Sequence, residues 1–130
     1  MDAHDAMIRS ALQRHRGREV KTVGDGSLVT FDSTSRAVRE AKEIVKATSD
    51  MGIEVRAGVH TGEVEVRTDD VVGLSVSIAK RVCDLAGSGE VLVSRPVTDL
   101  VVGSAFEFTE RGNHDLKGVP GTWKLFAVKS

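Results

Sequence analysis

Two polar side chains, Lys21 and Asp25, lie in a short stretch of otherwise strand-forming residues. Segment 20–31 places β-branched runs on either side of Asp25-Gly26, a pair that favours a tight hairpin turn. A turn of this kind holds the carboxylate of Asp25 rigidly at the tip. Turn chemistry also explains Asp25 without any function, so the stretch alone predicts only a hairpin with a lysine in its first strand.

The other reactive side chains are scattered. His4, His15, His60 and His114 lie in separate predicted elements without paired ligand spacing, and we interpret none of them as a metal site. Cys83 falls on the apolar face of a predicted helix and is interpreted as a core residue. A single cysteine allows no intrachain disulfide, which favours a reducing, cytoplasmic setting.

Length and composition fit one globular domain over residues 1–130. The formal net charge of −1 gives no electrostatic case for nucleic acid or an anionic membrane as partner. No apolar run approaches the roughly 20 residues that span a bilayer, and no signal peptide is evident. With one Trp, four Phe and no Tyr, an aromatic platform for stacking bases is not expected.

Apolar periodicity and turn residues predict the elements that must position these side chains. A second hairpin is expected from strand 53–60 and strand 63–67, which Thr61-Gly62 separates, and 111–121 is expected to be rich in turns. The predicted helices are 2–16, 35–50, 73–86 and 96–101, and the remaining predicted strands are the hairpin 19–32 and segments 90–94, 105–109 and 122–128.

This order predicts an α+β fold with helices on one face of a mainly antiparallel sheet. The ferredoxin-like arrangement β-α-β-β-α-β fits the order of elements, with its first strand missing. The chain begins with a predicted helix, where that arrangement has a strand.

Four blocks carry a family resemblance: VKTVGDG (20–26), VRAGVHTGEV (55–64), DVVGLSVSIAKRV (70–82) and LKGVPG (116–121). In this order and spacing, across nearly the whole chain, they resemble the catalytic domain of class III nucleotidyl cyclases, in particular bacterial adenylate cyclases. Each block alone is weak evidence, and the set is specific. The resemblance implies conversion of ATP to cyclic AMP and pyrophosphate.

The resemblance also implies roles for residues. Two divalent metals, Mg²⁺ or Mn²⁺, act in the family and are bound by two aspartates, of which Asp25 matches the second. Lys21 and Asp70 match the pair that selects adenine, since a donor and an acceptor at the base edge distinguish adenine from guanine. Arg81 matches the arginine that stabilises charge on the phosphoryl oxygens. Lys117 lies near the position where the family often has a phosphate-contacting lysine.

The sequence departs from the family at two places. Ser77 stands where the family has a ribose-orienting asparagine, one helical turn before Arg81. The strand that carries the first metal aspartate has no counterpart, because Asp2 and Asp5 lie in a predicted helix. A weak or inactive cyclase is therefore expected from this chain as given.

The resemblance further implies a head-to-tail homodimer, whose sites combine Asp25 of one chain with residues of the other. Two other functions stay open. One is a non-catalytic cyclase-homology module that binds nucleotide or a partner cyclase chain. The other is a palm-type transferase of the diguanylate-cyclase kind, although that family's Gly-Gly-acidic turn is absent.

Overall fold

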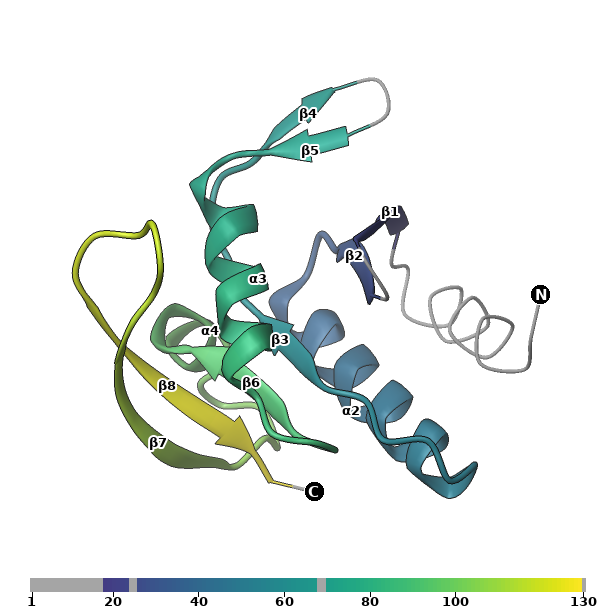
Figure 1. Cartoon of the computed structure of the whole chain (residues 1–130). Coiled ribbons are helices and arrows are strands. Elements are labelled where there is room, and N and C mark those ends of the chain that lie inside the picture. The colour runs from purple at the N-terminus through teal and green to yellow at the C-terminus, as the bar shows by residue number, and fades with distance from the viewer. Residues whose placement is uncertain (1–17, 24–25, 68–69, 130) are drawn as a thin grey trace.

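A four-stranded sheet forms the centre of the computed structural model, which describes residues 18–23, 26–67 and 70–129 (Figure 1). Its strands are β3 (Ala57–Val59), β6 (Val91–Ser94), β7 (Phe108–Asp115) and β8 (Thr122–Val128). Their order across the sheet is β3-β6-β8-β7. β3 and β6 are parallel, whereas β8 runs antiparallel to β6 and β7. The predicted α+β fold with a mainly antiparallel sheet is confirmed.

The helices begin and end near the residues that the sequence indicates. Those of the described residues are α2 (Thr34–Asp50), α3 (Leu74–Leu85) and α4 (Arg95–Leu100). Ser33 caps α2, its hydroxyl accepting a hydrogen bond from the Arg36 N–H at 3.4 Å. Gly52, with φ of 80°, follows the end of α2 in a conformation that favours glycine. The helix predicted over 2–16 lies outside the described residues.

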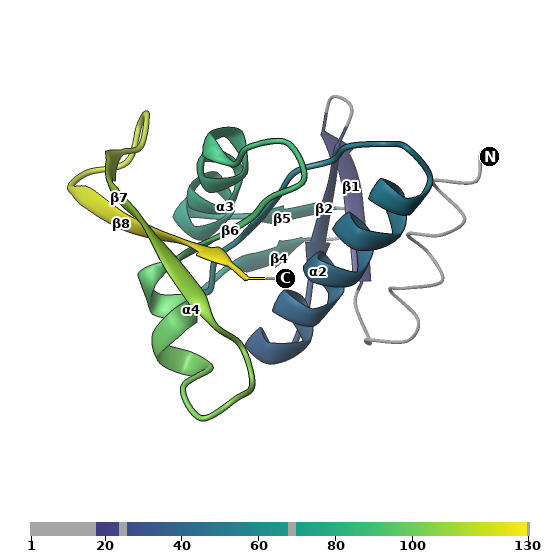
Figure 2. The ribbon, with the colours of Figure 1, turned by 90° about the horizontal axis from the view of Figure 1, so that it is seen from below.

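Helices cover both faces of the sheet, so the expectation of one covered face is wrong (Figure 2). Successive side chains of a strand point to opposite faces. Val91 and Val93 of β6 pack in one apolar cluster with α2, whereas Leu92 packs in a second cluster with α3. An apolar run such as Val91-Leu92-Val93 is typical of a strand buried on both faces.

Two hairpins lie outside the central sheet. β1 (Arg18–Val23) pairs with β2 (Gly26–Thr30), as Asp25-Gly26 predicts. β4 (Glu65–Arg67) pairs with β5 (Asp70–Val72) and stands away from the body (Figure 1). The predicted pairing of 53–60 with 63–67 is therefore wrong. β3 instead takes β6 as its parallel partner, because β3 and β6 share the apolar cluster under α2.

The central sheet and the first hairpin each have a free edge. Among the described residues, β3 is hydrogen-bonded only to β6 and β2 only to β1, while β7 is the other edge of the central sheet. Across residues 18–23, 26–67 and 70–129, no strand joins these two sheets. The arrangement agrees with a ferredoxin-like sheet that lacks its first strand.

β7 extends through part of the segment expected to form turns. It continues to Asp115, although a strand over 105–109 was expected. The register shifts between Glu110 and Asn113, and Gly112 there has φ of 86°. A bulge of this kind places extra residues in one strand without ending the pairing. Strand 122–128 is confirmed as β8.

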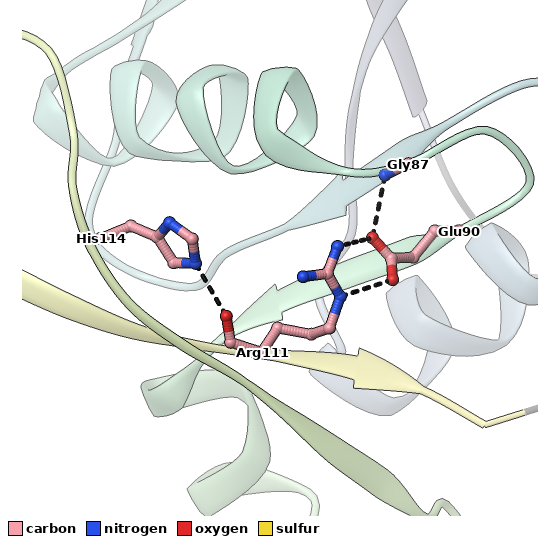
Figure 3. A network of polar contacts seen from close by, with 4 residues as sticks. All are labelled: Gly87, Glu90, Arg111 and His114. Carbon is pink, nitrogen blue, oxygen red and sulfur yellow. Dashed lines mark hydrogen bonds and ion pairs between the residues drawn. The ribbon is translucent and has the colours of Figure 1, made fainter.

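An ion pair fastens this bulge to the start of β6 (Figure 3). Arg111 donates from Nε and Nη2 to the two carboxylate oxygens of Glu90, at 2.9 and 3.1 Å. Glu90 also accepts from the Gly87 N–H at 2.9 Å, and His114 Nε2 lies 2.8 Å from the Arg111 carbonyl oxygen. The Arg111 hydrogen bond holds the pKa of Glu90 below its usual value of 4.5, Gly87 adds to this effect, and burial opposes it.

The Glu90→Gln substitution is expected to lower Tm at pH 7, because it removes the ion pair with Arg111. The decrease should be only roughly 1–3 °C, because an ion pair between partly exposed side chains stabilises the fold weakly. A carboxylate with a lowered pKa stabilises the fold above its unfolded pKa and loses this effect as pH falls through the folded value. The Tm difference should therefore narrow below pH 4.5 in thermal unfolding followed by circular dichroism. Glu107→Gln, at an exposed position just before β7, is the control. A pH-independent difference would contradict the ionic explanation.

Candidate active site

α3 carries two of the predicted site residues, Ser77 and Arg81, one helical turn apart. Ser77 is exposed, and the Arg81 side chain keeps 34% of its exposure. Arg81 Nη1 lies 3.5 Å from Asp84 Oδ2, at the long end of an ion pair. This contact is weak enough for the guanidinium to exchange Asp84 for an anionic ligand.

The start of α3 depends on backbone conformation. Gly73 occupies the N-cap position with φ of 138° and provides no side-chain cap. Its carbonyl accepts from the Val76 N–H at 3.1 Å. β5 ends at Val72, so the strand of Asp70 leads directly into the helix of Ser77 and Arg81.

Lys21 and Asp70 lie on strands that touch. Lys21 is in β1, paired with Leu28, and Asp70 is in β5, paired with Arg67. β1 contacts β5, although the two strands belong to different hairpins. The fold thus brings the strands of the predicted adenine-selecting pair together within one chain.

Lys117 is not brought to these strands. Lys117 is exposed in the connection between β7 and β8, where Leu116 and Val119 on either side are buried against α3. This connection and the β1–β2 hairpin lie on opposite sides of α3 (Figures 1 and 2). Asp25 lies outside the described residues, between paired Val23 and Gly26.

His60 is a structural feature that the sequence did not reveal. Its Nδ1 lies 2.6 Å from Ser94 Oγ, and its ring meets Trp123 edge-on at 5.6 Å. Ser94 is fully buried at the N-cap position of α4, and its hydroxyl bonds His60 and does not cap the helix. Burial lowers the pKa of His60 below its usual 6.5, which favours a neutral ring. The only sequence signal was its place at the end of a strand, before Thr61-Gly62.

The described residues contain no group of three His, Cys, Asp or Glu side chains arranged to bind a metal ion. The one predicted metal ligand, Asp25, is not among these residues. None of the helices described is both long enough and apolar enough to cross a bilayer.

Comparison with known proteins identifies the family. Its model, described as the adenylate and guanylate cyclase catalytic domain, matches residues 1–130. A Rhizobium meliloti protein named as an adenylate cyclase is 33% identical over 114 residues, which make up 81% of this chain and 19% of that protein. An uncharacterised Mycobacterium tuberculosis protein is 34% identical over 121 residues, which make up 89% of this chain and 42% of that protein.

A crystal structure agrees with the sequence comparisons. The adenylate/guanylate cyclase/hydrolase from Silicibacter pomeroyi superposes with a TM-score of 0.88 at 27% identity, over 94% of this chain and 76% of that one. The predicted resemblance to class III cyclases is confirmed, and the diguanylate-cyclase alternative is set aside. The chain spans less than half the length of either sequence relative. It belongs to the family of adenylate and guanylate cyclase catalytic domains.

Proposed function

We propose that this chain is a single adenylate-cyclase-type domain, which converts ATP to cyclic AMP and pyrophosphate at a site shared by two copies. The contact between β1 and β5, the strands of Lys21 and Asp70, carries the proposal. A lysine donor and an aspartate acceptor match the amino group and ring nitrogen of adenine, and oppose the reversed pattern of guanine. A cytoplasmic location is part of this proposal.

The residues of α3 act on the sugar and phosphates. Arg81 stabilises the negative charge that develops on the phosphoryl oxygens during attack by the ribose 3′-oxygen. Ser77 orients the ribose through a water molecule or a shifted sugar, because its hydroxyl is shorter than an asparagine amide. Lys117 contacts the triphosphate.

Magnesium or manganese belongs to this proposal through the family resemblance and Asp25. When bound, divalent ions held in part by Asp25 would supply activation of the 3′-hydroxyl and charge neutralisation of the triphosphate. Asp25 supplies one carboxylate, and hard cations of this kind take several oxygen ligands. A second carboxylate would complete the proposed site, and among the described residues no group of three or more His, Cys, Asp or Glu side chains could hold a metal ion by itself.

A head-to-tail homodimer completes the site. Asp25 of one copy faces Lys21, Asp70 and Arg81 of the other, so two equivalent sites form across a two-fold axis. The projecting β4–β5 hairpin supports this arrangement, because apolar side chains at its base are exposed: Val64 by 42% and Leu74 by 54%. Exposed apolar groups on a projecting element are typical of interaction surfaces.

We further propose that the 130-residue chain alone is a poor cyclase. A lone carboxylate binds two divalent ions weakly, and the free edges of β2 and β3 leave the sheet incomplete. The free edges and Ser77 also favour a second candidate, a non-catalytic module that binds nucleotide or a partner cyclase chain.

Extending the chain at its N-terminus by an apolar strand with one aspartate should raise both Tm and manganese-dependent cyclic AMP formation. The strand would pair with the free edges and add a metal ligand. Calorimetry and a chromatographic cyclic AMP assay measure the two effects. The same extension with Asn in place of Asp should raise Tm alone. Strong turnover by the unextended chain, abolished by Asp25→Ala, would contradict the proposal. Nucleotide binding without turnover in either form would favour the non-catalytic module.

The shared site predicts that two inactive variants complement each other. In the extended chain, Asp25→Ala and Arg81→Ala should each abolish turnover. An equal mixture should recover about a quarter of the parent activity, because half of randomly formed dimers are mixed and each keeps one intact site. Sedimentation with nucleotide present serves as the check on assembly. Dimers without any recovery, or monomers alone at high concentration, would rule out the head-to-tail site.

Base preference tests the proposed adenine-selecting pair, Lys21 on β1 and Asp70 on β5. Lys21→Glu with Asp70→Cys should weaken ATP binding relative to GTP by roughly 5- to 150-fold, the effect of losing a buried hydrogen bond. Competition against a fluorescent nucleotide measures both affinities, and Lys42→Glu on α2 is a control for altered charge. If the double variant keeps the parent preference, the base pocket lies elsewhere.

A further inference from the structure

Two glycines bring the backbone of the β3 segment directly against α3. A Cβ on Gly58 would lie 2.7 Å from the Cys83 Cα and closer still to the Cys83 N. A Cβ on Gly62 would collide with the Ser75 Oγ and lie 3.2 Å from the Ser75 Cβ. Neither glycine has a positive φ. Space, and not backbone conformation, therefore requires glycine at position 58, whereas at position 62 a Cβ would force the Ser75 hydroxyl to turn away and would still press on the Ser75 Cβ.

The distance between the two glycines along their segment matches the distance between their contact residues along α3. Gly58 and Gly62 are four residues apart, which an extended chain covers in at most about 14 Å. Ser75 and Cys83 are eight residues apart, which an α-helix covers in about 12 Å. The strand segment and α3 therefore run in opposite directions and touch near both ends of the helix.

His60 fixes the segment between the two glycines. Its Nδ1 is bonded to buried Ser94 and its ring rests against Trp123, so the side chain is tied to β6 and β8. Its Nε2 lies 3.6 Å from the position of a Cβ on Gly62. The segment that receives α3 is thus held by the sheet itself.

We infer that Gly58 and Gly62 form a two-point seat that sets the height of α3 on the sheet and so positions Ser77 and Arg81. Both residues lie between the contact points Ser75 and Cys83 on the helix. The glycines touch no substrate and act only through α3, as positioning residues. The effect on nucleotide rests on the proposed function, whereas the effect on the helix does not.

Gly62 offers a reversible test of this seat. Gly62→Ala should displace the first turn of α3, and Ser75→Gly in the same chain removes both atoms that the new methyl group meets. Gly58 offers no such relief, because its two nearest neighbours are backbone atoms of Cys83. Gly87→Ala is the matched control, since a Cβ there meets only Glu90 Oε1, at an ordinary 3.7 Å.

Amide hydrogen exchange on the full chain measures the displacement. Gly62→Ala should speed exchange at the first turn of α3 by roughly tenfold while α2 stays within about twofold of the parent chain. Gly62→Ala with Ser75→Gly should return to the rate of Ser75→Gly alone, and Gly87→Ala should match the parent. The proposed seat would be wrong if amide exchange accelerated equally in α2 and α3, if it did not accelerate at all, or if the double variant did not return to the rate of Ser75→Gly alone.

Nucleotide readouts test the functional consequence separately. Gly62→Ala should weaken binding of a fluorescent ATP analogue by several-fold, with recovery in the Ser75→Gly double variant. If the parent chain binds no nucleotide, the proposed function fails, and the exchange data still decide whether the seat exists. Normal binding together with a displaced α3 would show that the seat does not position Ser77 and Arg81 and would overturn that part of the inference.

Discussion

Burial of β6 on both faces is the interaction on which the rest of the molecule depends. All four residues of this strand are buried, with alternate side chains packed toward α2 and toward α3. β6 is also the strand that joins β3 to β8 by hydrogen bonds. Because the strand has no solvent-facing side, the two helices must occupy opposite faces. Their positions in turn determine where the site residues lie.

The proposed site residues are arranged around α3, the helix that shares a cluster with Leu92. β5 leads into its first turn, Arg81 lies in its third turn, and the loop of Lys117 packs on its side. The β1–β2 hairpin contacts β5 but lies across α3 from the Lys117 loop. A helix can present charged groups this precisely only if its own placement is rigid. The close contacts of Gly58 and Gly62 with α3 and the partly buried His60–Ser94 hydrogen bond provide that rigidity.

The free edges of β2 and β3 affect both the stability of the sheet and the proposed active site. Unpaired strand edges leave backbone donors and acceptors without partners and invite pairing with another strand. Among the described residues, one free edge is that of β2, in the hairpin that leads to Asp25, and another is that of β3, in the segment that seats α3. A strand added between them would connect the proposed metal ligand to the proposed transition-state residues. The same added strand would then complete both the sheet and the proposed site.

Local patterns in the sequence predicted most of the elements and are the basis for the proposed site residues. Asp25-Gly26 predicted the first hairpin, and three- and four-residue apolar spacing predicted α2 and α3. The motif blocks led to Lys21, Asp70 and Arg81 as proposed site residues. Only the tertiary structure decided which strands pair with each other. The parallel pairing of β3 with β6 joins residues 34 positions apart, as in Ala57 with Val91, and period-2 alternation carries no information about such a partner. The two covered faces, the bulge that extends β7, and the His60–Ser94 bond depend on the same long-range packing.

A glycine that is needed for space resembles, in sequence, a glycine that is needed for a turn, so only the approach of α3 distinguishes Gly58 and Gly62 from the others.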